Sequence, residues 1–157
     1  MGSSLVVFQT CSILSVVLFL KYFVTNLRWA VLKGKANLRA REDVNNNPNA
    51  TQDDVDRATQ AGRIVQNDLE NIPFALVFMW GTALAILGAA LTPLNNTSDL
   101  CTAHVVLATI FTVTRVTHSI IYILQLPLSR GGVFIIGTTA LFGMGIVGIV
   151  AAFEMTI

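Results

Sequence analysis

The chain has 157 residues, of which 54% are hydrophobic and 12% charged, and its formal net charge is +1. Soluble domains carry roughly 25% charged residues, so this composition excludes an ordinary water-soluble globule and a disordered chain. The near-neutral charge also excludes a nucleic-acid binder, because such proteins present a basic field to phosphates. A small integral membrane protein with one domain is the class that remains.

Four apolar stretches are each long enough to cross a bilayer core of about 30 Å as a helix. They cover approximately residues 5–32, 72–91, 101–126 and 132–152. Only helices and closed barrels satisfy the backbone in lipid, and these stretches lack an alternation with a period of two. We therefore predict an all-α fold, a single four-helix transmembrane bundle over residues 1–157.

The charges are concentrated in one segment between the first two stretches. Thirteen of the 19 charged side chains lie between Lys33 and Glu70. The third connection carries Arg130, whereas the second connection and the C-terminus carry no Lys or Arg. The distribution of Lys and Arg predicts that the polar connection, residues 33–71, and the third connection face the cytosol.

Local signals divide the polar connection into two helical extensions and a turn. Asn and Pro cluster at residues 45–49, which is typical of a turn. Thr51 is the expected N-cap of the second helix, because acidic residues follow in the first turn. We expect the first helix to continue through Arg39.

Three polar residues mark the point where the second helix approaches lipid. Arg63, Asn67 and Glu70 are spaced i, i+4 and i+7, so they fall within an arc of roughly 60° on one helix face. This pattern has two interpretations that spacing alone does not separate. The face is either part of a binding site or a solvated turn at the water boundary.

The third apolar stretch contains a more informative polar stripe. Arg115, His118 and Tyr122 are spaced i, i+3 and i+7 on one face. A guanidinium this deep costs from about 3 to over 10 kcal/mol, so Arg115 needs a partner or a water-filled cavity. Glu70 is the expected partner. A structural Arg115–Glu70 pair without a ligand is the alternative to a functional site.

Other polar residues within the apolar stretches give weaker signals. Lys21 lies inside the first stretch and either extends to the interface or faces the bundle, and the sequence leaves both open. No set of His, Cys and acidic residues has the spacing of metal ligands, so we assign no metal.

The polar residues together suggest a ligand with several charges. Arginine clamps carboxylates and a glutamate holds an amine, which suits a small molecule with carboxylates and an amine. Lipid would supply an apolar second substrate by partition. The candidate residues are Arg39, Arg63, Asn67, Glu70, Arg115, His118, Tyr122 and Arg130.

Four segments resemble the MAPEG family, the membrane-associated proteins of eicosanoid and glutathione metabolism. Residues 63–74, RIVQNDLENIPF, resemble the family signature R-x-x-x-N-D-x-E-N-x-P-F. Residues 115–122 match its R-x-x-H-x-x-x-Y pattern on the third helix. Arg39 followed by Asn47-Pro48 resembles its first loop, and residues 126–130 resemble the segment before its fourth helix.

This resemblance implies a homotrimer of four-helix subunits in the endoplasmic reticulum or a similar membrane, with glutathione bound between subunits on the cytosolic side. By analogy, Arg130 stabilises the glutathione thiolate and is the catalytic residue. The second substrate is a hydrophobic electrophile or lipid hydroperoxide from the bilayer. The remaining family positions would bind glutathione: Arg39, Arg63, Asn67, Glu70, His118 and Tyr122.

Departures from the family patterns favour one branch. Ala50 and Gly131 stand where the prostaglandin E synthase branch has Asp and Ser, and Phe134 replaces its Tyr. The resemblance is therefore closest to a microsomal glutathione S-transferase with peroxidase activity. The alternatives are a glutathione-dependent prostaglandin E synthase and a non-catalytic four-helix membrane assembly protein.

Overall fold

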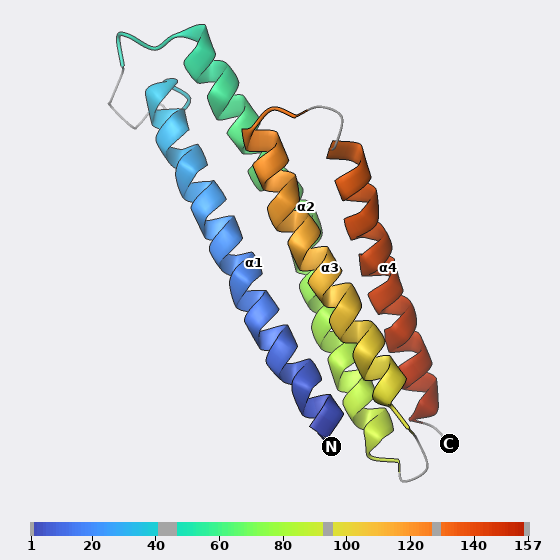
Figure 1. Ribbon diagram of the computed structural model, residues 1–157. Coiled ribbons are helices and arrows are strands. Elements are labelled where there is room, and N and C mark those ends of the chain that lie inside the picture. Colours follow the sequence, from blue (N-terminus) through green and yellow to red (C-terminus); the bar gives the residue numbers. More distant parts are fainter. Residues whose placement is uncertain (1, 41–46, 93–95, 127–129, 156–157) are drawn as a thin grey trace.

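The computed structural model describes residues 2–40, 47–92, 96–126 and 130–155, and these form an antiparallel bundle of four helices (Figure 1). The helices are α1 (Gly2–Lys35), α2 (Gln52–Ala90), α3 (Ser98–Ile123) and α4 (Arg130–Glu154). Both termini lie at one end of the bundle, and the first and third connections lie at the other (Figure 1). We call the latter the basic end, since it carries Lys33, Lys35, Arg39 and Arg63.

All four helices are long and apolar enough to cross a membrane, which confirms the predicted all-α transmembrane bundle. Their large apolar side chains are largely exposed, including Phe19 at 61%, Phe74 at 63% and Phe142 at 69%. In water this exposure would be unfavourable, whereas in a bilayer these side chains contact lipid. The apolar outer surface of the bundle is therefore suited to contact with lipid or with other apolar helices.

Helix α2 begins well before its apolar stretch, and Thr51 is its N-cap, as predicted. The Thr51 side chain accepts a hydrogen bond from the backbone N–H of Asp54, and Oδ2 of Asp54 accepts one from the backbone N–H of Thr51 over 3.0 Å. This reciprocal capping box satisfies two backbone donors that the helix leaves unpaired. Most of the second half of the polar connection is consequently helical.

Helix α1 ends at Lys35, so the prediction that it continues through Arg39 is wrong. Asn37 has a φ of 57°, and the N–H of Leu38 bonds to the carbonyl of Lys33 over 2.9 Å. A left-handed residue with this hydrogen bond ends a helix, and Asn adopts the conformation more readily than most residues. The backbone carbonyl of Asn47 accepts a hydrogen bond from Nδ2 of Asn37, and the backbone N–H of Asn47 donates one to Oδ1 of Asn37. These two bonds connect Asn47 to the end of α1.

The third helix likewise stops before the predicted residue 126. Gln125 has a φ of 57°, and the N–H of Leu126 bonds to the carbonyl of Ile121 over 3.1 Å. This is the same type of helix end as that of α1.

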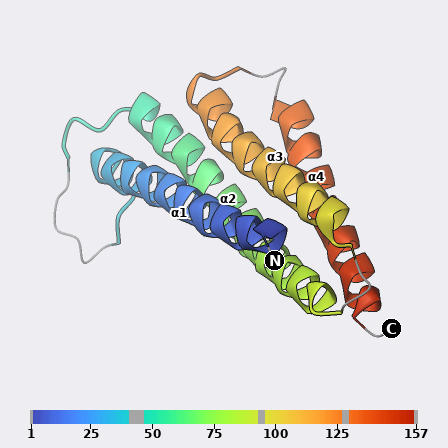
Figure 2. The same cartoon turned by 60° about the horizontal axis from the view of Figure 1, so that its bottom comes forward.

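Helices α2 and α3 form the centre of the bundle, while α1 packs against one side of them and α4 against the other (Figure 2). Gly148 of α4 packs directly on Thr82 of α2, whose hydroxyl donates to the carbonyl of Met144 over 2.9 Å. Small residues permit this close approach, which drives helix association in lipid through packing and interhelical hydrogen bonds.

Candidate functional site

Three predicted site residues follow one face of α2 near the basic end. Arg63 and Glu70 are exposed and Asn67 is half-buried between them. The carboxylate of Glu70 accepts a hydrogen bond from Nε2 of Gln66 over 3.0 Å. Arg63 forms no hydrogen bond or ion pair with any other residue that the structure describes. A guanidinium and a carboxylate are thus accessible on either side of the Asn67 amide.

The guanidinium of Arg115 lies inside the bundle, and the residue is only 1% exposed. Its Nη1 donates a hydrogen bond to Oδ1 of Asn67 over 2.8 Å. The rings of Phe111 and Phe134 lie 5.2 and 5.4 Å from its Cζ, within the range of cation–π attraction. Its Nε and Nη2 are buried without a hydrogen-bond partner among the described residues.

The expected Arg115–Glu70 pair is therefore wrong. Asn67 is the residue that Arg115 reaches on α2, and the Glu70 carboxylate instead lies at the surface with Gln66. Both Asn67 and Glu70 lie on the predicted polar face, but the axial register of α3 against α2 brings only Asn67 to the guanidinium. Glu70 consequently remains accessible to another molecule.

A buried ion pair between α1 and α2 lies beside this contact. Nζ of Lys21 bonds to Oδ1 of Asp68, and the hydroxyl of Thr25 donates to Oδ2 of the same carboxylate over 3.3 Å. Asp68 directly follows Asn67, the residue that Arg115 contacts. Of the two orientations left open for Lys21, the structure has the one that faces the bundle.

Sequence reasoning did not select Asp68 or Thr25, although a signal was present. Asp68 lies inside the quoted second-helix motif, and Lys21 is the only Lys or Arg in the first 27 residues. Two opposite charges that both lie in apolar surroundings seek each other, because an unpaired buried charge is costly. A search for the partner of Lys21 would have found Asp68.

His118 and Tyr122 lie together on α3, as their spacing predicts. Their ring centroids are 4.8 Å apart with an interplanar angle of 46°. The backbone carbonyl of Tyr122 accepts a hydrogen bond from Nε2 of Gln60 over 2.6 Å, which ties the end of α3 to α2. His118 is buried and Tyr122 is half-buried, so the tyrosine is the more accessible of the two.

The two remaining predicted residues do not join this cluster through any contact in the described part of the chain. Arg39 is exposed, and its guanidinium lies against Gly34 at the end of α1. Arg130 is the first residue of α4, and its side chain lies outside what the structure describes.

The architecture and the polar cluster define a class: a four-helix membrane bundle with charged and amide side chains gathered between α1, α2 and α3 near its basic end. A family model narrows this class, since the model of the MAPEG family matches residues 11–150. The chain belongs to the MAPEG family, whose members are membrane proteins of glutathione and eicosanoid metabolism. The chain has no match among curated proteins or solved structures.

Proposed function

We propose that this protein is a membrane-bound glutathione transferase with peroxidase activity. The observation that carries the proposal is the hydrogen bond from Arg115 to Asn67, which holds an amide between the accessible Arg63 and Glu70. A buried arginine is costly in a membrane helix and typically marks a functional site. Here its cost is offset in part by a contact that orders an exposed polar face.

The side chains on this face match the chemistry of glutathione, a tripeptide with two carboxylates, an amine and a thiol. Arg63 can clamp a carboxylate, because its guanidinium is exposed and unpaired among the described residues. Glu70 can hold the amine, and Asn67 can bond to a peptide group. The proposed binding residues also include Arg39, His118 and Tyr122.

In this proposal Arg115 does not contact glutathione directly. Its burial and its bond to Asn67 support a positioning role, in which it orients the amide that touches the ligand. Lys21 and Asp68 support the same helices from the α1 side. In this proposal the accessible residues of the cluster bind glutathione, and the buried residues hold the accessible ones in position.

Catalysis is proposed to depend on the thiolate of glutathione, stabilised by Arg130. The thiolate is the nucleophile, and a nearby cation increases its population by lowering the thiol pKa. In conjugation, the sulfur bonds to an electrophilic carbon and the leaving group departs with its electron pair. In peroxidase turnover, two glutathione molecules reduce one hydroperoxide to an alcohol and water and are themselves oxidised to the disulfide.

The apolar outer surface and the family support a proposal for the membrane environment and for the side from which each substrate enters. The electrophile or lipid hydroperoxide enters from the bilayer, and the basic end faces the cytosol, where glutathione is abundant. We further propose a homotrimer in the endoplasmic reticulum or another intracellular membrane.

The proposal is tested with the full chain purified in detergent. Three activities are measured with glutathione: conjugation of chlorodinitrobenzene, reduction of cumene hydroperoxide and isomerisation of a prostaglandin endoperoxide. Conjugation together with hydroperoxide reduction is expected. Endoperoxide isomerisation alone would assign the protein to the prostaglandin E synthase branch. Absence of glutathione binding by calorimetry would favour a non-catalytic membrane protein.

A further inference from the structure

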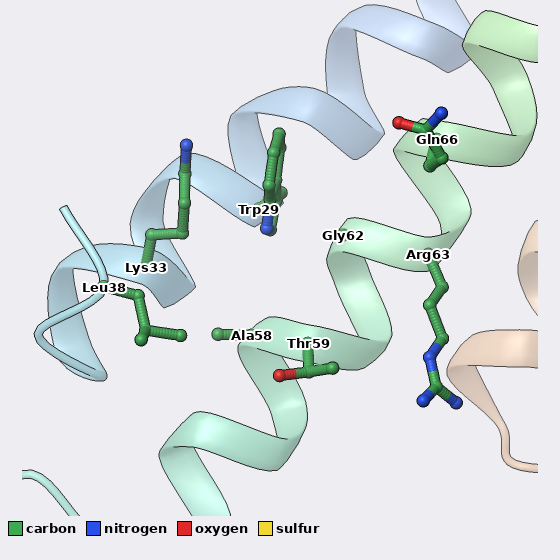
Figure 3. A pocket seen from close by; sticks show the side chains of 8 residues that line it. All are labelled: Trp29, Lys33, Leu38, Ala58, Thr59, Gly62, Arg63 and Gln66. Carbon is green, nitrogen blue, oxygen red and sulfur yellow. The ribbon is translucent and has the colours of Figure 1, made fainter. Parts of the chain in front are cut away.

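A polar cavity lies between α1 and α2 at the basic end, with a volume of about 400 Å³. Trp29 and Lys33 of α1 line one wall, and Gly62 and Gln66 of α2 line the other (Figure 3). Arg63 borders the cavity, but its side chain points away from Trp29 and Lys33 (Figure 3). The cavity therefore borders the face on which Arg63, Asn67 and Glu70 are accessible, and Arg63 is the residue that the two share.

The charged residues that line this cavity are all cationic. Lys33 supplies its positive charge beside Trp29, Arg63 borders it with the side chain turned away, and no acidic residue lines it. Nζ of Lys33 lies 3.9 Å from the centroid of the Trp29 ring, so the ammonium and the indole form one unit. The guanidinium of Arg39 lies against Gly34, the residue next to Lys33. An anion is the ligand that such a cavity favours.

The indole of Trp29 supplies a donor that no other described residue uses. Its Nε1 lies beside Gly62, where an added Cβ would be only 2.9 Å away, and it bonds to no other described residue. Any larger residue at position 62 would displace the ring. Gly62 thus keeps an indole N–H at the cavity wall, and such a group usually finds a hydrogen-bond partner.

The same helix pair continues into a mostly apolar groove with a volume of about 190 Å³, whose lining also includes Asp68, the partner of Lys21. Ser15 and Tyr22 line it on α1, seven residues apart and in register with Trp29. Leu69 and Leu76 line it on α2, and they are likewise in register with Gly62. Residues seven apart share a helix face, so the polar cavity and the apolar groove lie along one seam.

The dimensions of this seam match one leaflet of a membrane. Ser15 and Trp29 are separated by 14 residues, which is about 21 Å along a helix. The hydrocarbon half of a bilayer is about 15 Å thick. The seam therefore extends from the level of head groups into the hydrocarbon, with its cationic part at the outer end and its apolar part inside.

We propose that the seam between α1 and α2 binds one anionic phospholipid, with its phosphate at Trp29 and Lys33 and an acyl chain along Tyr22 and Leu69. Basic residues at a membrane surface attract anionic head groups, and tryptophan prefers this interface. The proposed phosphate contacts, Lys33 and Trp29, are not among the proposed glutathione-binding residues, although Arg63, which borders the cavity, is. A head group with net negative charge fits the cationic lining of the cavity better than a zwitterionic head group does.

The test measures lipid retained by the full chain in mild detergent, using native mass spectrometry after equilibration with phosphatidylserine and phosphatidylcholine of the same acyl chains. The wild-type chain should retain phosphatidylserine preferentially. Lys33→Gln should reduce this retention by about fivefold, the scale for one basic side chain at an anionic surface. Trp29→Phe, which keeps the ring but removes the N–H, should reduce it in the same direction.

Lys35→Gln is the matched control, since Lys35 is an exposed lysine near the same helix end and does not line the cavity. Equal retention of the two lipids, or equal losses in Lys33→Gln and Lys35→Gln, would overturn the proposal. Retention of oleate but not of phosphatidylserine, again dependent on Lys33, would overturn it in favour of a fatty-acid site. Glutathione binding by Lys33→Gln should equal that of the wild type, and its circular dichroism spectrum reports folding.

Discussion

Nη1 of Arg115 on α3 donates a hydrogen bond over 2.8 Å to Oδ1 of Asn67 on α2, and this bond joins a buried cation to an accessible polar face. The amide of Asn67 can rotate by itself, so its orientation depends on this partner. The carbonyl of Asn67 additionally accepts a bond from Nδ2 of Asn71 over 2.7 Å, which reinforces the same turn of α2. Arg115 can therefore affect a ligand that it does not touch.

A double-mutant cycle tests this positioning role. Arg115→Lys keeps the charge but loses the planar donor, and we expect it to weaken glutathione binding by about 1–3 kcal/mol, the scale of a charge-assisted hydrogen bond. In the Asn67→Ala background the same substitution should have little effect, because the two residues act through one bond. Isothermal titration calorimetry measures all four affinities. Strictly additive losses would show that Arg115 does not act through Asn67.

The Lys21–Asp68 pair predicts an ordering of stabilities. Asp68→Leu leaves Lys21 without its partner, and breaking a buried pair typically costs about 3–5 kcal/mol. Lys21→Met should cost less, because Thr25 still donates a hydrogen bond to Asp68. The double variant Lys21→Met/Asp68→Leu should be more stable than Asp68→Leu alone. Thermal unfolding in detergent gives the order, and a double variant less stable than Asp68→Leu would contradict it.

The helices of this protein can be predicted from sequence because lipid imposes a minimum apolar length on each of them. Their ends are harder to predict, since they depend on single residues such as Asn37 and Gln125 that adopt left-handed backbone conformations. The local composition does not show that these two residues, rather than other polar residues of the chain, adopt this conformation.

The candidate site shows a similar limit. Periodicity correctly predicts that Asn67 and Glu70 share a face of α2, because one helix has a fixed repeat. The choice between them as partner of Arg115 depends on how far α3 is shifted along α2, which no single-helix pattern contains. The orientation of Lys21 was open for the same reason, since its partner Asp68 belongs to another helix.

Glu70→Gln is expected to weaken glutathione binding by about 1–3 kcal/mol, because a neutral amide loses the charge-assisted bond to the amine. Asp56→Asn is the matched control. Asp56 is also an exposed carboxylate on α2 that accepts from a glutamine four residues earlier, as Glu70 does from Gln66. Calorimetry should show a loss for Glu70→Gln and none for Asp56→Asn. Equal affinities in Glu70→Gln and wild type would remove Glu70 from the binding site.

Arg130→Ala is expected to slow conjugation while it changes glutathione affinity by less than about tenfold. A cation beside the sulfur stabilises the thiolate, so its removal raises the pKa of the bound thiol and moves the pH–rate profile to higher pH. Stopped-flow measurement of thiolate absorbance against pH gives this shift directly. Arg57→Ala, at an exposed residue paired with Asp53, should leave the profile unchanged. An unaltered rate at every pH in Arg130→Ala would exclude Arg130 as the thiolate stabiliser.

Gly137 of α4 is expected to be necessary for the position of Arg115. A Cβ at residue 137 would lie 2.7 Å from Oγ1 of Thr114 and 3.3 Å from Nη2 of Arg115. Because Oγ1 of Thr114 is itself bonded to the carbonyl of Phe111, Gly137→Ala must displace a fixed group, and such overpacking costs about 1–3 kcal/mol.

Gly132→Ala on the same helix provides the control, since an added Cβ there meets no atom within 4 Å. Alanine is a better helix former than glycine, so this variant should be neutral or up to about 1 kcal/mol more stable. Thermal unfolding in detergent should therefore give opposite signs for the two substitutions. Gly137→Ala should also weaken glutathione binding through Arg115 and Asn67, whereas Gly132→Ala should not. Unfolding midpoints that are equal in the two variants would mean that α4 does not restrict the guanidinium of Arg115.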